Sequence, residues 1–134
     1  MNRLTGRIKN LVVEGNITLV TLMLKGDLKI KTLVIDTPET AEYLEVNQEV
    51  NVLFNETEVV IALESTSGLS LENKISCRVS AIQRGKLLSN IELECPAGTL
   101  RALVGTEALA DLEIESGQRV QAMIKLNEVM LSPR

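Results

Sequence analysis

The chain has 134 residues and a formal net charge of −4, and 45% of its residues are apolar although Tyr43 and Phe54 are its only aromatic ones. An acidic chain without basic runs lacks the electrostatic footprint of a protein that binds nucleic acid or an anionic membrane. Its start has no apolar stretch of signal-peptide length, and no segment approaches the ~20 apolar residues of a spanning helix. We therefore expect a soluble cytoplasmic protein with an aliphatic core, which favours strands.

The first half of the chain predicts three strands, a short helix and two more strands. Residues 7–13 and 17–24 read as strands separated by a turn at Gly15, and a third strand ends near residue 35. A helix is expected over residues 38–44, with Thr37 as its N-cap and Pro38 as its first residue. Residues 50–54 and 59–63 are expected to form two more strands that close this module.

The second half repeats the first at an offset of about 70 residues, because residues 7–8 recur at 78–79 and residues 57–61 at 127–131. Strands are expected near 78–83, 88–95, 120–126 and 129–131, with a third strand ending near 105 and a helix over 107–112 capped by Thr106. The prediction is an all-β fold with one short helix per module: two tandem OB-like five-stranded barrels at 1–64 and 70–134, joined by a linker at 65–69. Modules this small bury little surface, so we expect them to pack on each other and on further copies.

Few residues carry the means for catalysis or metal binding. Cys77 and Cys95 stand outside any CxxC pair and the chain has no His, so a metal site is not expected. The two cysteines are interpreted as reduced, small apolar residues in or beside strands, with a disulfide between them as the alternative. A nucleophile elbow and a glycine-rich phosphate loop are both lacking, and we do not expect an enzyme.

Two segments of the second half resemble a known family. Residues 70–73 read Ser-Leu-Glu-Asn and residues 124–131 read Ile-Lys-Leu-Asn-Glu-Val-Met-Leu. They are similar to the opening Ser-Ala-Arg-Asn and the closing Ile-Lys-Ala-Thr-Glu-Val-Met-Leu of the molbindin, or Mop, module, a TOBE-like family. The tandem resembles the di-Mop arrangement of molybdate-binding proteins and of the ligand-binding region of molybdate-responsive regulators. This resemblance implies that molybdate or tungstate binds at subunit interfaces, in a homotrimer that contains six modules.

The resemblance also implies which residues bind the oxyanion. In the second half these are Ser70, Asn73, Gly105, Thr106 and Lys125, and their first-half counterparts are Asn2, Thr37 and Asn55. The region around Thr106 fits this role physically, because free backbone N–H groups at a helix start attract anions. The sequence departs from the family at three of these segments: Glu72 replaces an arginine, Gly105 and Ala108 replace hydroxyl residues, and Asn55 replaces the closing lysine.

Each of these assignments has an alternative. Strand alternation alone places Lys125 on the solvent face, Ser70 and Asn73 are ordinary linker residues on composition, and the two threonines are helix caps. The leading function is an oxyanion-binding protein for storage, buffering or sensing. The alternative is an assembly or interaction domain, related to a molybdate regulator or transporter, whose anion sites have decayed. An OB-type nucleic-acid binder would need stacking aromatics and basic grooves, and the sequence has neither.

Overall fold

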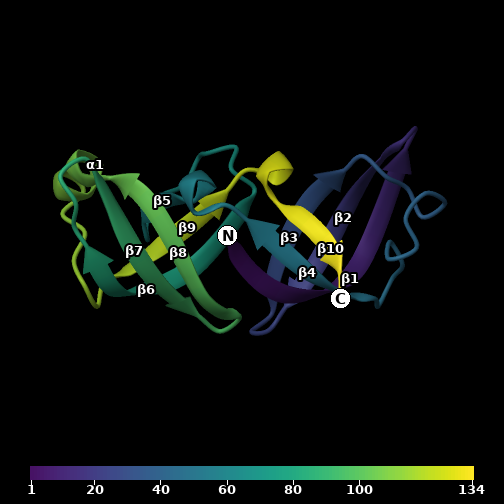
Figure 1. The fold of residues 1–134 in the computed structure, drawn as a ribbon, viewed down its shortest axis with the longest axis horizontal. Helices are drawn as coiled ribbons and strands as arrows, with labels where there is room; N and C mark the ends of the chain where they lie inside the picture. The colour runs from purple at the N-terminus through teal and green to yellow at the C-terminus, as the bar shows by residue number, and fades with distance from the viewer.

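The computed structural model describes residues 1–134 and contains two five-stranded antiparallel sheets and one short α-helix, α1 (Thr106–Asp111). The strand order is β10-β4-β1-β2-β3 in the first sheet and β5-β9-β6-β7-β8 in the second. Figure 1 shows the sheets side by side along the long axis, with α1 at the outer end of the second. The strands are β1 (Asn2–Glu14), β2 (Ile17–Leu24), β3 (Leu28–Val34), β4 (Glu49–Phe54), β5 (Val60–Leu63), β6 (Asn73–Gln83), β7 (Leu88–Cys95), β8 (Gly98–Gly105), β9 (Arg119–Ile124) and β10 (Met130–Pro133).

The predicted hairpins are confirmed in both halves. Strand β1 pairs with β2 and β2 with β3, while β6 pairs with β7 and β7 with β8. The turn after β1 contains Gly15 at a φ of +62°, a conformation that glycine adopts without steric cost. The ladder is interrupted between Ile8 and Asn10 in β1 and again between Val79 and Ala81 in β6. A bulge at equivalent positions shows that the sequence repeat is also a structural repeat.

The prediction that the last two strands of each half both close that half's own module is wrong. Strand β5 leaves the first half and pairs with β9 of the second sheet, with Val60 opposite Met123. Strand β10 leaves the second half and pairs with β4 of the first sheet, with Leu131 opposite Val52. The short 3₁₀ turns η1 (Glu56–Glu58) and η2 (Leu126–Glu128) carry the chain from one sheet to the other. Alternation of apolar residues identifies a strand, but it does not say which neighbour that strand pairs with.

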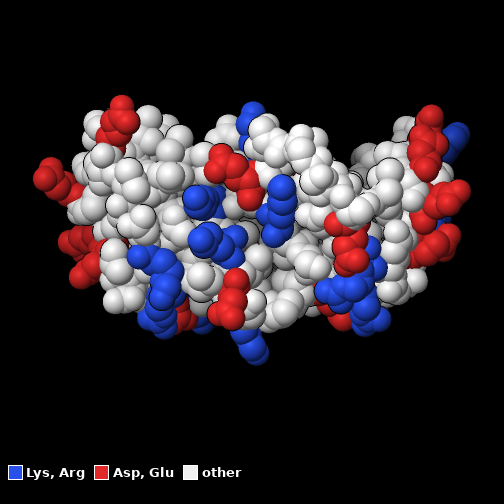
Figure 2. All heavy atoms as spheres, turned by 180° about the vertical axis from the view of Figure 1, so that it is seen from behind, with Lys and Arg blue, Asp and Glu red and all other residues white.

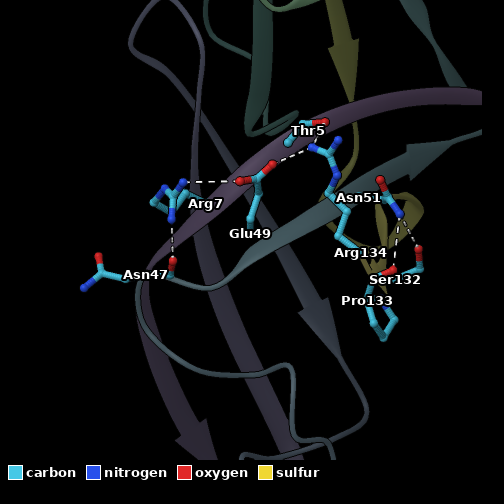
Figure 3. Close-up of polar contacts among 8 residues, drawn as sticks. All are labelled: Thr5, Arg7, Asn47, Glu49, Asn51, Ser132, Pro133 and Arg134. Carbon is cyan, nitrogen blue, oxygen red and sulfur yellow. Dashed lines mark hydrogen bonds and ion pairs between the residues drawn. The ribbon is translucent and has the colours of Figure 1, made fainter.

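Polar side chains fasten the exchanged strand β10 to the first sheet (Figure 3). The guanidinium group of Arg134 forms an ion pair with Glu49 and donates a hydrogen bond of 3.0 Å to the hydroxyl of Thr5. The amide of Asn51 donates to the hydroxyl of Ser132 at 3.1 Å. The chain's last residues therefore bind β1 and β4, which belong to the opposite half of the sequence.

The helix expected over residues 38–44 is also wrong, since the structure has only turns there. The carbonyl of Thr37 accepts hydrogen bonds from the N–H groups of Thr40 and Ala41, and no regular helix follows. The hydroxyl of Thr40 bonds to the backbone N–H of Thr37 and to the carboxylate of Asp36, so the backbone has local partners that compete with a helix. The second half does form its helix, over the better helix formers Ala108, Leu109 and Ala110.

The core is one continuous cluster of 25 buried residues drawn from both halves. Its single aromatic member is Phe54, which is 1% exposed at the end of β4. The turns at Gly26 and Pro96 also meet, because a Cβ added at Gly26 would lie 2.5 Å from the Cβ of Pro96. The prediction that the two halves pack on each other is thus confirmed. None of the helices has the length and apolar character needed to cross a bilayer.

Candidate functional site

The centre of the candidate site is Asn73, the first residue of β6. Its side-chain amide donates a hydrogen bond of 2.9 Å to the carbonyl of Lys31, and its carbonyl oxygen accepts one of 2.8 Å from the N–H of the same residue. Lys31 lies on β3, at the edge of the first sheet, and Asn73 is only 1% exposed. One buried amide therefore joins the start of the second half to the edge of the first.

Asn2 forms the equivalent junction at the start of β1. Its amide donates to the carbonyl of Arg101 at 2.8 Å, and its carbonyl oxygen accepts from the N–H of Arg101 at 2.8 Å. Arg101 lies on β8, the corresponding edge of the second sheet. The structure thus places both predicted asparagines, Asn2 and Asn73, on the backbone of the opposite half, where they hold the two sheets together. A direct contact with an oxyanion remains a prediction for both.

Lys125 follows β9 directly beside the Asn73 junction. The residue before it, Ile124, is the register partner of Asn73, and Lys125 itself is the N-cap residue of η2. The turn η2 lies against β3, where the hydroxyl of Thr32 donates a hydrogen bond to the carbonyl of Val129. Lys125 is exposed and takes part in no ion pair. Its ammonium group is consequently not neutralised within the chain, at the residue that follows the register partner of Asn73.

The remaining junction residues occupy matching or peripheral positions. Asn55 is the N-cap residue of η1 and follows Phe54, the register partner of Asn2, so it corresponds to Lys125 in the other junction. Ser70 is exposed in the linker, three residues before Asn73. No local signal pointed to Lys31, which is 42 residues away from Asn73 along the chain and meets it only through the packing of the two sheets.

Gly105 and Thr106 lie elsewhere, at the end of β8 and the start of α1. Gly105 is the N-cap residue, and the prediction that Thr106 caps the helix is wrong because Thr106 is its first residue. The hydroxyl of Thr106 instead donates to the carbonyl of Gly85 at 2.9 Å and lies 2.7 Å from the hydroxyl of Ser89. These are tertiary contacts with the turn before β7, and nothing in the local sequence indicates them.

Thr37, the first-half counterpart, does accept a hydrogen bond of 3.3 Å from the N–H of Glu39 through its hydroxyl oxygen. This is the bond that an N-cap residue forms, although only turns follow it here. Thr37 therefore retains the capping contact without the helix.

Within one chain, the predicted second-half residues fall into two groups. Asn73 and Lys125 lie at the junction with β3, whereas Gly105 and Thr106 lie at the far end of β8. Gly105 pairs with Leu88 at the start of β7, beside the end of β6, whereas Asn73 is the first residue of β6, so the two groups lie at opposite ends of these strands. A ligand in contact with both groups would require residues from more than one copy of the chain.

Two apolar clefts open on the surface. One, of about 270 Å³, lies between α1 and β5 and contains Gly105, Ala108, Leu112 and Val60 among its lining residues. The other, of about 410 Å³, lies on the β1–β2 hairpin and is lined by Val12, Glu14, Ile17, Leu19 and Leu33. Both place apolar side chains against solvent at the outer parts of the molecule.

The charges of the chain are unevenly distributed. Figure 2 shows acidic side chains at both ends of one face and basic side chains mainly in its central part. No lysine takes part in an ion pair, whereas five arginines do: Arg7, Arg78, Arg101, Arg119 and Arg134. The lysines near the junction therefore carry uncompensated positive charge on a chain that is acidic overall.

One protein family and two solved structures are similar to this chain. Residues 69–131 match the TOBE domain family. The cytoplasmic molybdate-binding protein ModG, solved with molybdate bound, superposes with a TM-score of 0.91 at 24% identity, over 99% of this chain and 96% of that one. A molybdate-binding protein from Sporomusa ovata matches 44% of this chain and 88% of its own, at 27% identity and a TM-score of 0.43. Curated protein sequences yield no match. The predicted resemblance of the second half to a TOBE-like family is thus confirmed by the match over residues 69–131, and the chain shares its two-sheet fold with ModG.

Proposed function

We propose that this chain is a cytoplasmic, non-enzymatic binding protein for molybdate or tungstate, serving storage, buffering or sensing. The proposal takes its ligand and its location from ModG, which is a cytoplasmic molybdate-binding protein with the same fold over nearly the whole chain. The observation that carries it is the junction at which the unpaired Lys125 lies beside the buried amide of Asn73. A tetrahedral dianion needs N–H and O–H donors together with a nearby cation, and this junction supplies both.

The junction is better suited to an anion than to a metal ion. The chemical groups at hand are a lysine ammonium group, amide nitrogens and the hydroxyl of Ser70, which donate hydrogen bonds. Lys31 adds a second cation without an ion pair on the neighbouring strand. A charge-assisted hydrogen bond contributes about 1.5–3 kcal/mol, so one lysine can account for a large part of the binding energy.

We further propose that the site is completed between copies of the chain, in a homotrimer. The Gly105 and Thr106 donors lie too far from Lys125 to share an anion within one copy, so a second copy would supply one group. The apolar clefts beside α1 and on the β1–β2 hairpin offer surfaces for such contacts. Contiguous exposed apolar surface of this kind is typical of protein–protein interfaces.

The finer description of the fold belongs to the same proposal. We propose that each five-stranded sheet curls into an OB-like barrel, and that residues 1–64 and 70–134 are the two evolutionary modules, joined by residues 65–69. The equivalent bulges in β1 and β6 support this division. Each barrel then contains four strands of its own module and one strand of the other.

Thermal unfolding with added oxyanions tests the function directly. A ligand that binds only the folded state stabilises it by RT ln(1 + [L]/Kd), about 2.7 kcal/mol at a hundredfold excess over Kd. We expect molybdate and tungstate to raise the melting temperature while sulfate and phosphate at equal ionic strength do not. No shift with any of the four anions would contradict the proposal and favour the assembly-only alternative.

A lysine substitution tests the site. Lys125→Ala removes one charge-assisted bond, so molybdate affinity measured by isothermal titration calorimetry should fall by roughly 10- to 150-fold. The unliganded protein should keep its stability to within about 0.5 kcal/mol, since the side chain is exposed. Lys9→Ala is the matched control, because Lys9 is also exposed and unpaired but lies on the bulge of β1. Equal affinities for both variants would remove Lys125 from the site.

Asn55→Lys restores the family's lysine in the first half. It should strengthen binding there if that junction also takes an anion.

A further inference from the structure

The two cysteines of the chain are brought together by the second sheet. The ladder between β6 and β7 ends with Arg78 opposite Glu94, and Cys77 and Cys95 are the next residues of the two strands, which the antiparallel register sets opposite each other. Residues directly opposite each other point to the same face of a sheet. The two cysteines are 18 residues apart in the sequence, yet their side chains are neighbours in the sheet.

The geometry of this pair suits a covalent bond between the sulfurs. Opposed residues in an antiparallel ladder have Cα atoms about 4.5 or 5.5 Å apart, and both values fall within the roughly 4.4–6.8 Å that a disulfide spans. The Cys77 thiol donates to the carbonyl of Ile75 at 3.3 Å, and the Cys95 thiol donates to the carbonyl of Gly98 at 3.4 Å. Cys95 packs against the core cluster that contains Cys77, so both side chains lie on the inner face of the sheet. Both cysteines are free thiols in this structure.

The two thiols differ in accessibility and in chemical character. Cys77 is fully buried, whereas Cys95 is half-buried at the hairpin between β7 and β8. Interaction with the neighbouring Cys77 thiol, joined by backbone hydrogen bonds at Ala97 and Gly98, lowers the pKa of Cys95 to about 6. The same interaction, together with burial, raises the pKa of Cys77. One sulfur is accordingly a thiolate near neutral pH, and the other is a protonated neighbour held against it.

We propose that Cys77 and Cys95 form a redox-active dithiol that a low-molecular-weight disulfide converts into a cross-strand disulfide. In the first step the Cys95 thiolate attacks one sulfur of the small disulfide, forms a mixed disulfide and releases one small thiolate. In the second step Cys77 loses its proton and attacks the sulfur of Cys95, which releases the second small thiol. The protein loses two electrons and two protons, and the small disulfide becomes two thiols.

The position of the pair links this bond to the contact between the halves. Strand β6, which carries Cys77, begins with the junction residue Asn73. The turn that follows Cys95 packs Pro96 against Gly26 of the first half. A covalent bond between β6 and β7 would tie the Asn73 strand to this turn, so the oxidised protein should melt at a higher temperature than the reduced one.

Oxidation with glutathione disulfide under native conditions tests the proposal. The wild-type protein is incubated with the oxidant, quenched with acid, denatured, alkylated with N-ethylmaleimide and weighed by mass spectrometry. We expect a product that has lost two hydrogen atoms, carries no glutathione and accepts no maleimide, and peptide mapping should join Cys77 to Cys95. Two free thiols, a lasting glutathione adduct or a disulfide-linked dimer would each overturn the proposal.

Serine variants separate the roles of the two sulfurs. Cys77→Ser should accumulate a mixed disulfide between glutathione and Cys95, because no second thiol resolves it. Cys95→Ser should remain unmodified, because Cys77 is buried and protonated. A glutathione adduct that forms as fast in Cys95→Ser as in Cys77→Ser would contradict the assigned order of attack. The wild-type peptide map decides on the disulfide itself should either variant fail to fold.

Discussion

The junction at Asn73 offers a direct test of how the two halves are held together. Asn73→Ala removes two hydrogen bonds, of 2.8 and 2.9 Å, between a side chain that is 1% exposed and the backbone of Lys31. Each bond contributes about 1 kcal/mol, and the unpaired groups of Lys31 add a further cost that water partly offsets at a strand edge. We expect the free energy of unfolding to fall by about 2–3 kcal/mol.

Urea unfolding at a fixed protein concentration, without oxyanion, measures this loss, and an unchanged m-value would show that only stability has changed. Asn10→Ala is the matched control, because Asn10 is exposed on β1 and its side chain makes no hydrogen bond within the chain; we expect a change within about 0.5 kcal/mol. Asn2→Ala removes the equivalent pair of bonds from a side chain that is 5% exposed, so its cost should be similar. A loss below about 0.5 kcal/mol for Asn73→Ala would refute the view that this amide ties the sheets together.

Three more predictions follow from the packing of the chain. Deleting residues 130–134 should expose the amides of β4 to hydrogen exchange while those of β7 and β8 keep their protection, because β10 pairs only with β4; uniform loss of protection would contradict this. Gly26→Ala should destabilise the protein by about 1–3 kcal/mol more than Gly15→Ala in urea unfolding, since both residues have positive φ but only Gly26 would bring a Cβ to 2.5 Å from Pro96; equal costs would refute the clash. The rate of Cys95 alkylation by iodoacetamide should rise with pH through a midpoint near 6, as the protonated thiol becomes a thiolate, and a midpoint near the ordinary value of 9.0 would show that Cys77 does not stabilise this thiolate.

The local features of the fold were predictable from the sequence. The alternation of Val20, Leu22 and Leu24 marks an inward face of β2, and all three side chains are buried. Gly15 indicates the first turn because glycine, which has no Cβ, adopts the positive φ of a tight turn without steric cost. The repeat is equally readable, since it rests on strings of residues that recur along the chain. Signals of this kind depend only on residues close in sequence, so tertiary contacts do not change them.

The features that were missed depend on contacts between distant residues. The strand at 59–63 was expected, but its pairing with β9 follows from how the halves pack and leaves no trace in its own apolar pattern. Lys31 joins the candidate site through Asn73, and Cys77 meets Cys95 through the register of two strands. The absence of the helix expected at 38–44 has a local cause. The Thr40 hydroxyl forms hydrogen bonds with nearby groups, and helix propensity alone does not account for these bonds.

The exchange of terminal strands also bears on how the protein is made. Val52 on β4 pairs with Leu131, so the first sheet cannot be completed until almost the last residue has been added. At about 5–20 residues per second, the roughly 80 intervening residues take on the order of 4–16 s to synthesise. During that interval the edge of β4 is an open template for any other extended chain. We therefore expect nascent chains on one messenger RNA to exchange β10 with each other. Products truncated before residue 130 should be prone to aggregate.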